Sequence, residues 1–318
     1  MNTRIATFLD FFERKEGATS VALCRIGIGL TLCLHALRLL TSGTAQLTLT
    51  HVSEGGLGIY HGALRAVGGA TPQHVNMLVL ALAISGAVVA LGLMTRASLF
   101  ASWTLLQMVS ALNPDAQGDY DRLLSQSLFL LIWSGCEKAL SLDKLLIPKL
   151  KTGEQTVAVW PRVLIVFHLA LLYAGSAMAK ISLSWLPVGD GTALWHLAHH
   201  PLWIRAATQP LSMSFFNLSR WMTFGIWTWE LTWPIWFVVV WLPRQNKRHT
   251  LSVNRAFMAR AGHYVFNAYL VTGLLFHVLA ECFTEIGPFS FAMLSLYFCC
   301  LKPTAWQRIG ARLTRFWH

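Results

Sequence analysis

Long apolar runs, separated by short polar segments, dominate the pattern of hydrophobic and polar positions along this chain. A helix needs about 20 apolar residues to cross the hydrocarbon core of a bilayer. Eight runs approach or reach this length, near Ala18–Leu40, Val75–Met94, Ala97–Leu112, Leu123–Leu140, Val163–Ala179, Leu218–Leu242, Gly262–Phe283 and Ile286–Cys300. Only helices and closed barrels satisfy the backbone in lipid, and unbroken apolar runs favour helices. The sequence therefore predicts an all-α polytopic membrane protein, a bundle of about eight transmembrane helices.

Composition agrees with this fold class. Of the 318 residues, 55% are hydrophobic and only 12% are charged. The 14 tryptophans suit the aromatic belts found at both membrane interfaces. No linker rich in Pro, Gly or Ser divides the chain, so we expect one transmembrane domain over residues 1–318.

The distribution of Lys and Arg predicts the orientation. If the N-terminus is cytoplasmic, most of them fall on the cytoplasmic side, chiefly in residues 1–17, 141–162, 243–261 and 301–318. The positive-inside rule then predicts that both termini are cytoplasmic. The net charge of +11 reflects loops facing anionic lipid, and we expect no nucleic-acid partner.

Lys180 ends the apolar run that begins at Val163, on the predicted outer side of the membrane. A charge at the centre of a membrane helix costs about 2.5–3.5 kcal/mol, and less toward the ends, so an intramembrane lysine is a candidate functional residue. Loss of water disfavours the charged form of an amine, which makes it a better base near neutral pH. Tyr173 and Ser176 share the face of Lys180. The alternatives are a lysine that reaches the headgroups and a polar stripe between helices.

Two further spans carry polar groups that need partners. Glu230 lies within the sixth predicted span, and Lys180, Arg25 and Arg38 are its candidate partners; for Arg25 we expect a structural ion pair. His277 precedes Glu281 by four residues, so the two can pair, either to relay protons or to bridge helices.

Neither candidate metal site is strong. Asp115, Asp119 and Asp121 follow the third span near Asn113, but their order does not match an EF-hand loop. His196 and His200 would share a helix face without a third ligand, and an interfacial amphipathic segment explains them better. We expect no metal site, and the chain has no P-loop, GxSxG, HExxH or GxGxxG motif.

Four blocks in order resemble the vitamin K-dependent γ-carboxylase family and, more broadly, the horizontally transferred transmembrane (HTTM) domain. The first is Tyr173-Ala-Gly-Ser-Ala-Met-Ala-Lys180, with Trp185 five residues after the lysine and Gly189 close behind. The others are Phe276-His277 with the following Ile286-Gly287-Pro-Phe289 and Met293, the turn Ser141-Leu142-Asp143, and the pair Asn113 and Asp119.

The resemblance implies a chemistry. In the family, the lysine is the base that deprotonates reduced vitamin K on the lumenal side, and oxygen then adds. The reaction yields a quinone epoxide and a strong base that allows carboxylation of a glutamate. The resemblance makes Lys180 the catalytic base and His277 its catalytic proton or hydrogen-bond partner, and it adds Trp185 and Asn113 as substrate or cofactor contacts. From the residue pattern we expect the same role for Tyr173, Ser176 and Glu230. The family carboxylases have a histidine after the asparagine, where this chain has Pro114. We also expect no large C-terminal lumenal portion, because the chain ends at His318.

Three functional hypotheses follow. The first is a membrane enzyme that uses reduced vitamin K or menaquinol for oxygenation and epoxidation, coupled to carboxylation or other modification of a peptide. The second is a non-catalytic factor like the SdpB-like relatives, for maturation of, or immunity to, a secreted peptide. The third is a small-molecule transporter, against which stands the lack of internal symmetry. In each we expect a bacterial inner membrane location, lipid contacts and an active face turned outward.

Overall fold

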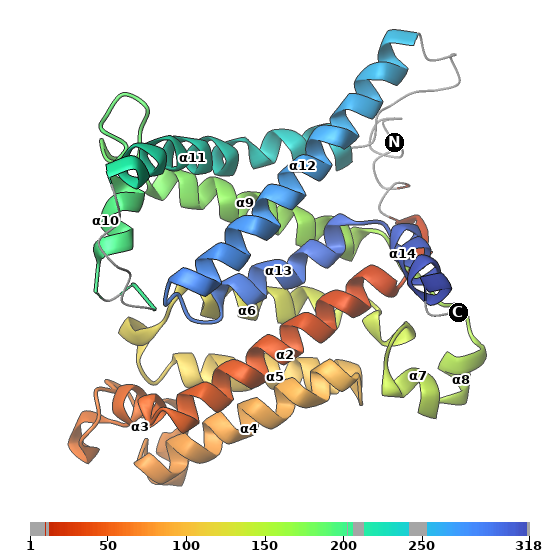
Figure 1. The fold of residues 1–318 in the computed structure, drawn as a ribbon. Helices are drawn as coiled ribbons and strands as arrows, with labels where there is room; N and C mark the ends of the chain where they lie inside the picture. The colour runs from red at the N-terminus through yellow and green to blue at the C-terminus, as the bar shows by residue number, and fades with distance from the viewer. Residues whose placement is uncertain (1–9, 11–12, 202, 206–212, 242–252, 317–318) are drawn as a thin grey trace, which may run out of the picture. The chain divides into compact units, whose positions relative to one another are not determined.

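The computed structural model describes residue 10 and residues 13–201, 203–205, 213–241 and 253–316 (Figure 1). Helices make up most of these residues. The α-helices are α2 (Thr19–Thr41), α3 (Thr44–Leu49), α4 (Pro72–Leu91), α5 (Thr95–Ser110), α6 (Asp119–Ile132), α7 (Leu142–Leu146), α8 (Pro148–Thr152), α9 (Trp160–Ala179), α10 (Ala193–His199), α11 (Met213–Trp241), α12 (Val253–Phe283), α13 (Phe289–Cys300) and α14 (Pro303–Phe316). Two short strands, β1 (Lys15–Gly17) and β2 (Thr156–Ala158), pair antiparallel.

An α-helix lies at each of the eight predicted spans. Four of the described helices are long and apolar enough to cross a membrane: α2, α4, α9 and the part of α12 from Tyr264 to Phe283. The protein is thus an all-α membrane protein, while the number of eight spans and the side of each terminus stay predictions. The fourth predicted span, Leu123–Leu140, is wrong in extent. The helix ends at Ile132, because Gly135 takes a left-handed φ of 69° and a 3-10 turn, Cys136–Lys138, follows it.

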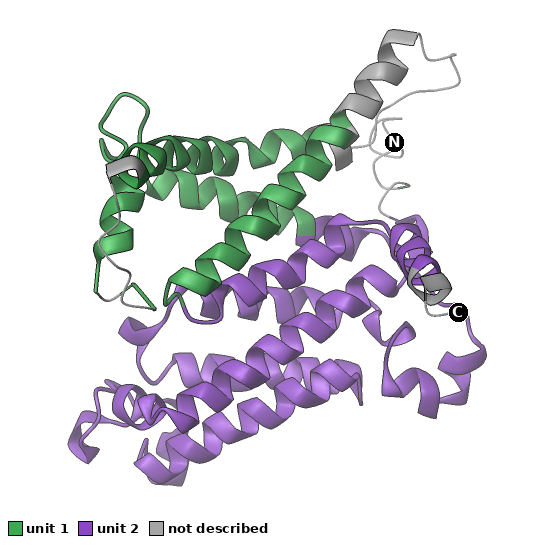
Figure 2. Ribbon diagram, in the orientation of Figure 1, with its two compact units in different colours: residues 1–11, 166–286 green, residues 12–165, 287–318 purple. Residues whose placement is uncertain are grey.

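The contacts divide the chain into two compact units (Figure 2). Unit 1 comprises residues 1–11 and 166–286, and unit 2 comprises residues 12–165 and 287–318. Each unit is assembled from stretches that are separated in sequence, so the division follows no linker. The prediction of a single domain over residues 1–318 stays a prediction.

In unit 2, α2 is packed closely against α4 because small residues line the contact. A Cβ on Gly29 would lie 2.5 Å from the backbone nitrogen of Ala90, and one on Gly86 would lie 2.8 Å from that of Cys33. On the α13 side, a Cβ on Gly27 would collide with Ser295. Such small-residue contacts let membrane helices approach until their backbones touch.

Arg25 is a fully buried charge in the core of unit 2. Its guanidinium donates to the carbonyl oxygens of Val89 at 3.2 Å and Leu140 at 2.5 Å. The expected ion pair of Arg25 is therefore wrong: carbonyl dipoles, including one near the C-terminal end of α4, take the place of a carboxylate. The adjacent Asp143 instead accepts from the backbone N–H groups of Met94 and Thr95, each at 2.7 Å, and so fixes the start of α5.

A second buried charge joins the β-hairpin to α9 in unit 2. Arg162 donates to both carboxylate oxygens of Glu16 and to the carbonyl oxygen of Cys299. Only 4% of the Arg162 side chain is exposed. The paired groups tie β1, α9 and the end of α13 together.

Unit 1 contains α10, α11, α12 and α9 from Val166 onward. Aromatic side chains form its core: Trp229 and Trp233 of α11 contact Tyr173 of α9 and Tyr269 of α12. Trp229 also donates from its indole N–H to the backbone oxygen of Tyr269 at 3.3 Å. These contacts hold the three long helices in a fixed register around the polar groups described next.

Substitution of Gly92 tests the packing around Arg25. Gly92 has a φ of 69°, and a Cβ there would collide with the Arg25 guanidinium and lie 2.6 Å from Ser141 Cβ. Left-handed backbone costs alanine about 1–2 kcal/mol, and overpacking adds about 1–3 kcal/mol. Gly43→Ala is the matched control, since Gly43 has a φ of 74° with no atom within 4 Å of the added Cβ. We expect Gly92→Ala to lower the thermal denaturation midpoint in detergent well below that of Gly43→Ala; equal midpoints would contradict the packing.

Candidate functional site

A buried ion pair between α9 and α11 forms the centre of the site. Lys180 follows the last residue of α9, and its Nζ lies 2.6 Å and 2.7 Å from the two carboxylate oxygens of Glu230. The Glu230 side chain is only 3% exposed, and that of Lys180 is 23% exposed. Of the three candidate partners for Glu230, the structure thus selects Lys180.

Two side chains complete the environment of this pair. Ser176, one turn before Lys180 on α9, donates to Glu230 at 3.3 Å. Trp185 lies with its ring centroid 5.0 Å from the lysine nitrogen, a distance at which the face of an indole attracts a cation. The amine therefore contacts both a buried carboxylate and an aromatic ring.

The loop after Lys180 is folded in a way that holds Trp185 in place. The backbone N–H groups of Trp185 and Leu186 donate to Ser182 O, and that of Asp190 donates to Leu183 O. Gly189 permits this closure, because a Cβ there would lie 2.7 Å from the Leu183 Cα. This gives a physical role to the glycine that follows the lysine and tryptophan in the sequence.

A second hydrogen-bonded pair lies deeper along α9. The hydroxyl of Tyr173 is 2.7 Å from Nε2 of His277 on α12, and His277 is fully buried. Tyr173 precedes Lys180 by seven residues, or about 10 Å along the helix axis. The two pairs therefore share α9 as a scaffold, and Trp229, next to Glu230 in sequence, contacts the Tyr173 ring at 4.7 Å.

The pairing of His277 with Glu281, predicted from their spacing of four residues, is wrong. Glu281 accepts instead from Arg205 at 2.7 Å, and Arg205 also donates to Glu285 at 3.3 Å. The loop around residue 204 lies against the end of α12, where Ile204 and Thr284 form an antiparallel bridge. The Glu281 carboxylate thus pairs with a guanidinium, and the buried His277 imidazole pairs with a phenol.

Asn113 belongs to unit 2 and has a different environment from the other predicted site residues. Its side-chain amide donates to the carbonyl oxygens of Thr48 at 2.8 Å and Leu57 at 3.1 Å, so it fastens the loop after α3. Its Oδ1 is buried and has no hydrogen-bond partner among the described residues. Its predicted contact with a substrate or cofactor stays a prediction.

Metal-binding clusters are not found in the described part of the chain: no three His, Cys, Asp or Glu residues there are placed to hold an ion. His199 of α10 hydrogen-bonds the backbone oxygen of Trp195, and Asp121 accepts from the backbone of Gly118. His199 and Asp121 thus each make a local contact with the backbone.

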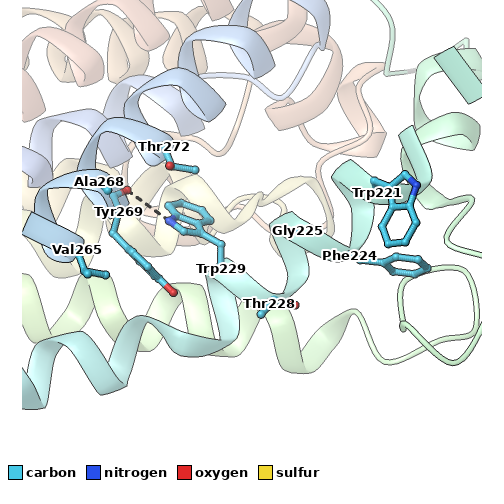
Figure 3. Close-up of a pocket in the computed structure, with 9 residues that line it drawn as sticks. All are labelled: Trp221, Phe224, Gly225, Thr228, Trp229, Val265, Ala268, Tyr269 and Thr272. Carbon is cyan, nitrogen blue, oxygen red and sulfur yellow. Dashed lines mark hydrogen bonds between the residues drawn. The ribbon is translucent and has the colours of Figure 1, made fainter. Parts of the chain in front are cut away.

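The sequence interpretation missed an aromatic groove between α11 and α12 (Figure 3). The groove has a volume of about 570 Å³ and is lined by Trp221, Phe224, Gly225, Thr228, Trp229, Val265, Ala268, Tyr269 and Thr272. Trp229 and Tyr269 are joined across it by the indole hydrogen bond drawn in Figure 3. The signal was present in the tryptophan-rich stretch around Glu230, but only the packing of α12 shows which of those rings line a groove.

The family comparison confirms the broader resemblance, to the HTTM domain, while the resemblance to the γ-carboxylases stays a prediction. The model of the HTTM domain matches residues 13–306, a stretch that contains every predicted site residue. No curated protein and no solved structure matches the chain.

The unequal burial of the two charges predicts unequal effects of removing them. Lys180→Met leaves the Glu230 carboxylate buried without its cation, and loss of one partner of a buried pair costs about 3–5 kcal/mol. Glu230→Gln leaves the more exposed amine, which can reach solvent, so we expect less than half that loss. The control is Lys15→Met, because the Lys15–Glu154 pair is 63% and 59% exposed and exposed pairs contribute about 0–1 kcal/mol. Thermal denaturation in detergent would contradict the account if Lys180→Met were no worse than Lys15→Met.

Proposed function

The chain belongs to the HTTM domain family, and from this premise we propose that it is an integral membrane enzyme that oxidises a hydroquinone with oxygen. In this proposal, Lys180 with Glu230 accepts a proton from a substrate hydroxyl group at the outer face of the membrane. The observation that carries the proposal is the ion pair between the Lys180 amine and a carboxylate that is only 3% exposed.

A buried amine–carboxylate pair is suited to moving a proton. In water the ionic form of such a pair is strongly favoured. Removal from water makes two separated charges costly, and so reduces the free-energy difference between the ionic form and the neutral form. Glu230 can then take the proton that would otherwise stay on Lys180, so that the amine is free to accept one from a substrate. Ser176, at 3.3 Å from Glu230, holds the carboxylate in place during this exchange.

The aromatic groove supports an aromatic ligand with an apolar tail. Its lining is dominated by aromatic and aliphatic side chains, with Thr228 and Thr272 as polar groups, which is the lining expected for an apolar ring system. Trp221, Phe224 and Tyr269 would hold the ring and tail of a reduced vitamin K or menaquinol there. When bound, the quinol supplies the electrons that reduce oxygen, with quinol and oxygen converted to quinone epoxide and water.

Three other residues, Trp185, Tyr173 and His277, support the reaction around the Lys180–Glu230 pair. Trp185, with its ring centroid 5.0 Å from the Lys180 nitrogen, would stabilise the charged form of the amine. Tyr173 and His277 form a hydrogen-bonded pair that can hold or pass a proton along α9. Because Pro114 stands where the γ-carboxylases have a histidine, we propose epoxidation as the reaction and treat carboxylation or other modification of a secreted peptide as a separate, coupled step. The proposed location is a bacterial inner membrane.

Oxygen-dependent epoxidation is the test. Purified protein supplied with reduced vitamin K should form the epoxide, and Lys180→Ala should lower the rate at least about a hundredfold, the lower range for loss of a general base. Lys15→Ala, which removes a lysine from an exposed pair with Glu154, should keep the wild-type rate.

An epoxidation rate in Lys180→Ala equal to wild type would remove Lys180 from the mechanism. Folded wild-type protein that forms no epoxide would refute the enzyme hypothesis. The favoured function would then be a non-catalytic factor for a secreted peptide, like the SdpB-like relatives, or a transporter.

A further inference from the structure

The helix α14 is tied to the end of the transmembrane bundle of unit 2. It begins two residues after α13, and the connecting Leu301 accepts a hydrogen bond from Ser20 of α2 at 2.8 Å. Trp306 donates from its indole N–H to the carbonyl oxygen of Phe298 at 3.1 Å, and the two rings lie 5.4 Å apart. Figure 1 shows α14 beyond the ends of α13 and α2, running in a different direction from both. A link of two residues spans at most about 7 Å, so α14 stays next to the membrane end of α13.

The described side chains of α14 divide into two faces. Arg308 and Arg312 are four residues apart, which places them on one side of the helix, and both are exposed. Trp306 and Ile309 are three residues apart on another side, where Trp306 meets Phe298 and Ile309 is 40% exposed. The sequence from Pro303 to its end contains no Asp or Glu. The helix is therefore cationic and amphipathic, with no acidic partner of its own.

We propose that α14 lies in the plane of the membrane interface and binds the headgroups of anionic phospholipids through Arg308 and Arg312. A helix with basic and apolar faces that is anchored at the end of a span lies where lipid headgroups are, and its charge is complementary to phosphatidylglycerol or a similar lipid. This inference is independent of the proposed enzymatic function. A basic residue near an anionic surface contributes about 1 kcal/mol, or roughly a fivefold gain in binding for each arginine.

Hydrogen exchange of the full-length protein in nanodiscs tests the proposal. Peptides that cover residues 303–316 should exchange at least about tenfold more slowly in nanodiscs of equal parts phosphatidylglycerol and phosphatidylcholine than in phosphatidylcholine alone. Salt at about 1 M should remove the difference, because it shortens the screening length to about 3 Å. The variant Arg308→Gln/Arg312→Gln should lose the difference.

The matched control, Lys149→Gln/Lys151→Gln in α8, removes two charges from the same predicted side and should keep the lipid effect. Hydrogen exchange in α4 shows whether each variant is folded. The salt test uses the wild-type protein alone, so it does not depend on the folding of any variant. Equal exchange of α14 in the two lipids would overturn the proposal. So would a lipid effect of undiminished size in Arg308→Gln/Arg312→Gln, or strong protection in phosphatidylcholine, which would mean that another part of the protein covers the helix.

Discussion

The organisation of unit 1 depends on one constraint: the Glu230 carboxylate of α11 is almost completely buried and must be neutralised where it is. Lys180 does this from the end of α9, so α9 and α11 have to run side by side in one register. With that register set, Tyr173 lies between the rings of α11 and the buried His277 of α12. The folded loop after Lys180 then brings Trp185 over the amine.

Unit 2 shows how the same protein treats buried charges that serve structure. Arg25 gives its hydrogen bonds to backbone carbonyls of Val89 and Leu140, and Arg162 joins Glu16 to the carbonyl of Cys299. In each case the guanidinium connects chain segments that are far apart in the sequence. Lys180 and Glu230 bond each other, Glu230 also accepts from Ser176, and neither side chain hydrogen-bonds the backbone of any residue that the structure describes. This difference from the buried arginines of unit 2 is the reason that we propose a chemical role for the pair.

The sequence was sufficient for the fold class and for much of the site, because hydropathy periods and an intramembrane lysine are local signals. A helix lies at every predicted span, and Lys180, Ser176 and Glu230 do come together. The errors arose where tertiary contacts decide. Spacing alone paired His277 with Glu281, but Arg205, from a loop distant in sequence, takes Glu281. Arg25 was expected to need a carboxylate, although backbone carbonyls accept its hydrogen bonds. The end of α6 depended on the backbone conformation of Gly135, and the aromatic groove depended on how α12 meets α11, which no pattern within one helix records.

The central claim is that the Lys180–Glu230 pair serves catalysis, and that the apolar contacts of unit 1 are enough to hold its fold when both charges are removed together. The most direct measurement is the rate of oxygen-dependent quinol epoxidation by the double variant Lys180→Met/Glu230→Met, with its thermal stability determined on the same sample. Replacing a buried pair with apolar side chains of similar size is often neutral or stabilising by about 1–4 kcal/mol. The account predicts a protein at least as stable as wild type that forms no epoxide. A stable double variant that still forms epoxide at the wild-type rate would contradict the claim.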